Sequence, residues 1–182
     1  AAITATALLA LLAFAPLAAA TPDPVASGKT TIKLNQKLLK QLRQDGIRIT
    51  GLKPATVKGR TVTLKVNGGS FDPTNNKGRL THSGGIRVKW GKKSVPIRGL
   101  ELNTTKKGLF GKVGGKRMKI ASLAGARFTR QGFGVKATIN KLRLTGNGAV
   151  QLDRKLNPTK RKGKKASRSA AIPAPFKANA LL

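Results

Sequence analysis

The sequence predicts an all-β fold, an antiparallel sandwich or barrel with two short capping helices, and three observations support this. Apolar and polar residues alternate along most of the chain from Lys29 onward, as in strands with one buried face. Turn-forming Gly, Pro, Asn and Asp residues interrupt the alternation at short intervals. Two stretches have helical spacing instead. Short strands with frequent turns are typical of sandwiches and barrels.

The chain divides into a leader, a linker and one domain. Residues 1–20 are uncharged, rich in Leu and Ala, and end in three alanines, a pattern typical of a secretory signal segment. A retained membrane anchor or a buried helix is the alternative, although Pro16 lies inside the run. Residues 21–28 contain Pro, Ser and Gly and are predicted to be a linker. Residues 29–182 then form a single β-rich domain, long enough to bury a core.

The strands of this domain follow from period-two alternation. In TVTLKV (61–66), Val62, Leu64 and Val66 share one face, and IRVKW (86–90) repeats the pattern up to Trp90. Lys and Arg occupy mainly the outward positions, so much of the positive charge is predicted to be the solvated face of the sheet. The same rule predicts strands at 30–34, 95–97, 100–102, 133–139 and 142–144.

Two segments are predicted to be helices that cover an open end or edge of the β-structure. Residues 35–44 follow an N-cap candidate, Asn35, and stop before Gly46. Residues 148–156 form the second helix. Each helix follows a strand and a polar corner, so residues 32–42 and 142–152 share one supersecondary type. The apolar residues at helical spacing include Leu38, Leu39 and Leu42 in the first segment and Leu152 and Leu156 in the second.

The composition argues against catalysis. Against 37 Lys and Arg there are five acidic residues, all isolated in the sequence, whereas general acid–base chemistry needs paired titratable groups. Without Cys, a thiol nucleophile or a cysteine-based zinc site is excluded, and a Ser-His-Asp triad would have to use the single histidine, His82. We therefore predict that the protein is not an enzyme and has neither catalytic nor metal-binding residues.

One region resembles a known family. Residues 62–113 are similar to the HtaA-type domain of secreted, mainly actinobacterial proteins associated with haem transport. The matching residues are Gly68-Gly69, Asp72-Pro73, Gly78, His82-Ser83-Gly84-Gly85 and Gly108-Leu109-Phe110-Gly111-Lys112-Val113.

The resemblance implies haem binding, which in this family uses Tyr with support from His. This chain has no Tyr, so iron coordination would rest on His82. An apolar slot beside Trp90 and Phe71 would hold the porphyrin, and nearby Lys and Arg would meet its propionates. The family's usual tryptophan-bearing entry segment is also absent.

The strand pattern leaves two roles open for His82. Leu80 and His82 share a face, and continued alternation would place both on the side of Trp90. The ring is then a half-buried structural group, hydrogen-bonded to backbone or to Ser, and no cofactor is needed. A bulge at Gly84-Gly85 would instead turn the ring outward, toward a ligand.

Residues 158–169 are predicted to be a basic flexible segment, because they contain no acid and no large apolar residue. Such a segment either binds polyanions or is a solvated linker that keeps the protein soluble. Its cations are Lys160, Arg161, Lys162, Lys164, Lys165 and Arg168.

Charge and export together predict the function. A net charge of +32 outside the cytoplasm meets anionic cell-wall polymers or the lipid head groups of a membrane surface. We predict a secreted or envelope-associated, noncatalytic binding or structural module with such a partner. The alternative is a haem-binding or haem-transport module that uses His82. Sequence-specific nucleic-acid binding is not expected, because no reading motif is present. The oligomeric state is left open.

Overall fold

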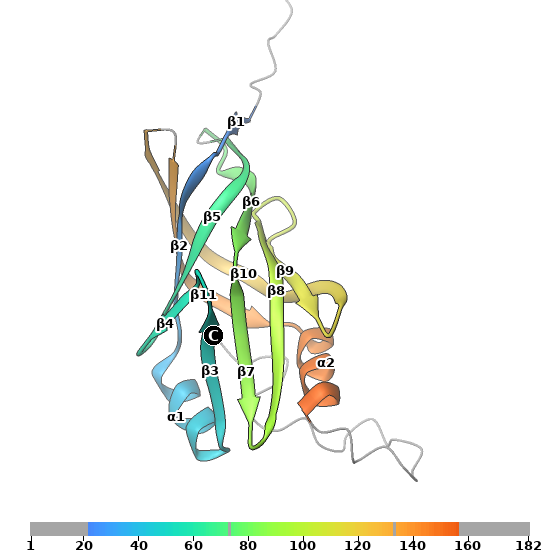
Figure 1. The fold of residues 1–182 in the computed structure, drawn as a ribbon. Coiled ribbons are helices and arrows are strands. Elements are labelled where there is room, and N and C mark those ends of the chain that lie inside the picture. The colour runs from blue at the N-terminus through green and yellow to red at the C-terminus, as the bar shows by residue number, and fades with distance from the viewer. Residues whose placement is uncertain (1–21, 73, 133, 157–182) are drawn as a thin grey trace, which may run out of the picture.

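The computed structural model describes residues 22–72, 74–132 and 134–156, and most of these lie in strands (Figure 1). The first elements are β1 (Asp23–Pro24), β2 (Ser27–Lys33), α1 (Gln36–Gln44), β3 (Ile47–Leu52), β4 (Thr56–Lys58), β5 (Thr61–Asp72) and β6 (Lys77–Ser83). They are followed by β7 (Gly85–Trp90), β8 (Lys93–Asn103), β9 (Gly108–Val113), β10 (Lys116–Gln131), β11 (Gly134–Leu144) and α2 (Gly146–Leu156).

Seven strands close into a barrel, which confirms the all-β prediction. Their order is β5, β2, β11, β10, β9, β8 and β6, and β6 pairs back onto β5. Three further strands extend the wall at one end. β7 pairs with the first half of β8, β3 pairs with β7, and β4 pairs with the first residues of β5.

The sheet is mixed, because it contains one parallel pair among the antiparallel ones. β2 and β11 run parallel, whereas the other pairs in the ring are antiparallel. A closed ring in which every neighbour alternates in direction needs an even number of strands. Seven strands therefore leave one parallel pair, and it joins the first and last strands of the ring. No local pattern in the sequence indicates this pairing.

Residues 23–24 and 27–28, within the segment 21–28 predicted to be a linker, pair in the sheet as β1 and the start of β2. β1 pairs with the end of β5, and Val25 is buried and donates its backbone N–H to the Gly69 carbonyl at 2.9 Å. The stretch satisfies backbone groups along β5 that would otherwise lack partners. The Pro, Ser and Gly content of residues 21–28 does not indicate this pairing. The predicted signal segment, 1–20, lies outside the described residues.

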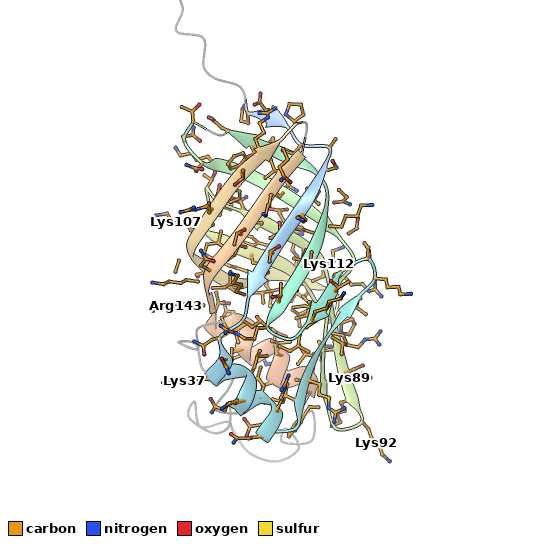
Figure 2. All side chains as sticks on the ribbon, turned by 90° about the vertical axis from the view of Figure 1, so that its left-hand side faces the viewer. Lys37, Lys89, Lys92, Lys107, Lys112 and Arg143 are labelled. Atoms are coloured by element: carbon orange, nitrogen blue, oxygen red, sulfur yellow. The ribbon has the colours of Figure 1, made fainter. Side chains whose placement is uncertain are left out.

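The two helices cover one end of the barrel, as predicted (Figures 1 and 2). At the start of α1, the Asn35 side chain accepts hydrogen bonds from the backbone N–H groups of Lys37 and Leu38. Because β2 and β11 are parallel neighbours, the helices that follow them emerge at the same end. Residues 32–42 and 142–152 each contain the end of one of these strands, a corner and the start of the following helix. In the part of the chain that the structure describes, no helix has the length and apolarity needed to cross a membrane. The helices bury Leu38, Leu42, Ala149, Leu152 and Leu156.

β10 is the longest strand, and the alternation pattern did not predict it. Its pairing with β11 shifts register between Leu123 and Gly125 and again before Ala126. Such irregularities interrupt the period of two. Leu123 and Phe128 therefore pack against the core without forming a regular alternating face.

Gly28 lies where β2 contacts β11, and we expect its substitution by Ala to be strongly destabilising. Its φ is +145°, and a Cβ atom there would overlap the Val135 carbonyl oxygen and lie 2.9 Å from the Val135 nitrogen. Backbone atoms in a closed ring cannot move aside cheaply, so we expect a loss of about 3 kcal/mol or more in urea unfolding.

Gly59→Ala is the matched control. Gly59 also has a positive φ, +56°, but no atom lies within 4 Å of the added methyl group. This variant should lose only about 1 kcal/mol, the conformational cost of a left-handed residue. Equal losses for the two variants would show that the β2–β11 contact is not tightly packed.

Candidate polyanion-binding face

The outer surface of the barrel is predominantly basic. The described residues include 30 of the 37 Lys and Arg and all five acids. Basic side chains project from both sides of the molecule, among them Lys37 and Arg143 on one side and Lys89 and Lys92 on the other (Figure 2). Five acids cannot neutralise thirty bases, so most cations are left facing water.

Three lysines meet in register on one face of the barrel. Strands β11, β2 and β5 lie side by side on the side that faces the viewer in Figure 2. Lys136 is directly opposite Lys29, and Lys29 is directly opposite Lys65; all three are exposed. Adjacent strands are about 4.8 Å apart, so this lysine row places three positive charges across roughly 10 Å. Like charges directly opposite one another destabilise a sheet.

A row of threonines runs beside the lysine row. Thr138, Thr31 and Thr63 are paired in the same way on the same three strands, each two residues from the lysine on its strand. All three are half-buried, and their hydroxyl groups can donate hydrogen bonds to an anion. The two rows together are called the lysine–threonine face. Among the described residues, no ion pair holds Lys29, Lys65 or Lys136.

A second basic row differs because it borders an acid. Arg98, Lys112 and Arg117 are directly opposite one another on β8, β9 and β10. The carboxylate of Glu101 is buried there and pairs with Arg117 and, at 2.9 Å, with Arg79. This carboxylate offsets part of the local charge. The positive charge of the lysine row is therefore less neutralised than that of this second basic row.

His82 lies inside the barrel with both ring nitrogens hydrogen-bonded. Its Nδ1 is 3.2 Å from the Leu100 carbonyl oxygen, and its Nε2 is 2.7 Å from Thr30 Oγ1. Because a carbonyl only accepts, Nδ1 carries the proton and Nε2 accepts from the Thr30 hydroxyl. Burial lowers the pKa of His82 from 6.5 to about 4, against the opposing effect of the Leu100 hydrogen bond. The geometry favours the structural role that the sequence left open.

The residues of the expected haem slot are not brought together. Phe71 stacks on Phe128, with ring centroids 4.7 Å apart, at the end of the barrel where β1 lies. Trp90 is the last residue of β7, at the opposite end, where it is half-buried and paired with Ile47. His82 is on β6 between them (Figure 1). Iron coordination by His82 would require breaking one of its two hydrogen bonds.

The cations that the sequence analysis identified as polyanion-binding are not those of the lysine–threonine face. The predicted segment 158–169 lies outside the described residues, so its role stays a prediction. The lysine row was missed because Lys29, Lys65 and Lys136 look like ordinary outward strand positions in the sequence. Alternation alone marks them as exposed, but strand order and register are needed to place them together.

Comparison with protein families and curated proteins identifies no relative of this chain. The chain matches no protein-family model, and no curated protein matches it significantly. The resemblance of residues 62–113 to HtaA-type domains therefore stays a prediction. Within the described ranges, no three His, Cys, Asp or Glu side chains gather as a metal site would require.

The buried, neutral His82 predicts a specific dependence of stability on pH. In the unfolded chain the ring takes up a proton near pH 6.5, whereas in the folded barrel it does so only near pH 4. The stabilisation that comes from keeping His82 neutral is therefore fully present above pH 7 and is lost as the pH falls from 6.5 to 4. We expect the free energy of unfolding to fall by about 2 kcal/mol between pH 7 and pH 5, measured by urea titration with Trp90 fluorescence.

His82→Gln is the control for this prediction. The variant keeps a polar side chain at this position, but the Gln side chain takes up no proton between pH 7 and pH 5. Its stability should change much less over the same range. Parallel pH profiles for the two proteins would contradict the assignment of a neutral, buried histidine.

Proposed function

We propose that the protein is a noncatalytic binding module of the cell envelope that holds an anionic polymer on its lysine–threonine face. The observation that carries this proposal is the register of three exposed lysines across β11, β2 and β5 with no ion-pair partner among the described residues. An anion laid across the row would relieve the repulsion between the lysines. The neighbouring threonine hydroxyls would add hydrogen bonds.

An extended polymer suits this face better than a small anion. The row runs across three strands, and basic side chains continue around the barrel on both sides (Figure 2). Successive negative charges of one chain could therefore meet successive cations. Each lysine near an anionic surface contributes about 1 kcal/mol, reduced by salt. Haem capture at His82 gains no support from the geometry, since both ring nitrogens are already hydrogen-bonded.

The proposal predicts that removing the lysine row weakens polymer binding. In the variant Lys29→Gln/Lys65→Gln/Lys136→Gln, the loss of three contacts should lower affinity for polyglycerol phosphate, the backbone of a teichoic acid, by about 100-fold at low salt. Affinity of the unaltered protein should fall steeply between 50 and 500 mM NaCl. Both can be measured by fluorescence anisotropy with a labelled polymer.

Lys40→Gln/Lys92→Gln/Lys116→Gln is the matched control, because it removes the same charge from scattered exposed positions outside this face. It should weaken binding by much less than the row variant. Equal losses would mean that total charge, and not this face, is responsible. Salt-independent binding, or binding to anionic vesicles without binding to the polymer, would discard the polymer as partner.

A further inference from the structure

A groove opens between α1, β3 and β4 at the helix-covered end of the barrel. Its volume is about 450 Å³. Leu39, Ile49 and Val57 contribute half-buried apolar side chains that pack against the core. Arg43 and Arg48 are exposed and belong to the same lining. The groove thus combines an apolar surface with two guanidinium groups.

The groove exists because the sheet is open here. Within the described residues, β3 pairs only with β7 and β4 pairs only with β5, so each of these strands has one edge without a strand partner. They approach each other at the turn between them, where the Ala55 N–H donates to the Leu52 carbonyl at 3.0 Å. Away from this turn, β3 and β4 are not joined by a ladder of hydrogen bonds. The groove lies between these two strands and α1.

An apolar cavity inside the barrel adjoins the groove. The cavity has a volume of about 60 Å³, and its lining consists entirely of apolar residues, including Ile49 and Ile86. Ile49 also lines the groove, so its side chain forms part of the wall between the two spaces.

We propose that this groove binds a single-chain anionic amphiphile, a fatty acid in the simplest case. The acyl chain would lie along Leu39, Ile49 and Val57, and the carboxylate would meet Arg43 and Arg48. Guanidinium groups bind carboxylates through paired hydrogen bonds, and no ion pair among the described residues holds either arginine. This charge complementarity favours an anionic amphiphile over a neutral one.

This inference is independent of the proposed polymer binding. The groove is formed by α1, β3 and β4, whereas the lysine–threonine face lies on β11, β2 and β5. Apolar side chains enclosed in a groove with a few convergent polar groups are characteristic of small-molecule sites. Each site can therefore be disrupted without altering the other.

The test is a titration of the full-length protein with a fluorescent polyene fatty acid, kept below its critical micelle concentration in 0.3 M NaCl. We expect saturable binding at one site per chain. Arg43→Gln/Arg48→Gln should weaken binding at least tenfold, and a fatty alcohol of the same length should bind about as weakly as the acid binds this variant. Absence of saturable binding, or equal affinity for acid and alcohol, would overturn the proposal.

Variants that fill the groove complete the test. Ile49→Trp should abolish binding, and Thr50→Trp provides a second blocking change at an exposed position of the same lining in case the first impairs folding. Lys29→Gln/Lys65→Gln/Lys136→Gln should bind the fatty acid as the unaltered protein does. Folded groove-filling variants that still bind, or loss of binding in the lysine variant, would place the amphiphile elsewhere.

Discussion

The closure of seven strands into a ring through the parallel pair of β2 and β11 is the constraint on which the rest of the structure depends. This pair brings the first and last strands of the ring together, with Lys29 opposite Lys136. It also directs the helices that follow both strands to the same end of the barrel (Figure 1). The juxtaposition of Lys29 with Lys136 and the placement of both helices at one end are therefore consequences of one pairing.

Polar side chains can be buried in the barrel at low cost only where they have hydrogen-bond or ion-pair partners. Burial keeps His82 neutral, and the Thr30 hydroxyl and the Leu100 carbonyl provide hydrogen-bond partners for its two ring nitrogens. Glu101, the most buried carboxylate with an ion pair, is matched by two arginines at the surface. The other cations remain in water, where the strong dielectric screening weakens their mutual repulsion. A stable fold and a highly basic surface are compatible for this reason.

Both proposed sites lie where the structure accepts an unfavourable local arrangement. Lysines are directly opposite one another on β11, β2 and β5, and apolar side chains are partly exposed between α1, β3 and β4. A bound anion would reduce the repulsion between the lysines, and a bound acyl chain would cover the exposed apolar side chains. Local conflicts of this kind are expected at functional sites in sequences that are otherwise consistent with their fold.

The sequence by itself determined the class of structure and the direction in which side chains face. Alternation identified the inward residues of most strands, and Asn35 with the leucine spacing identified α1, because both depend on interactions within a few residues. Register, strand order and ring closure depend on contacts between distant segments, which local patterns do not encode. Only the tertiary structure therefore assembled Lys29, Lys65 and Lys136 into one row, enclosed His82 with Thr30, and left the gap between β3 and β4.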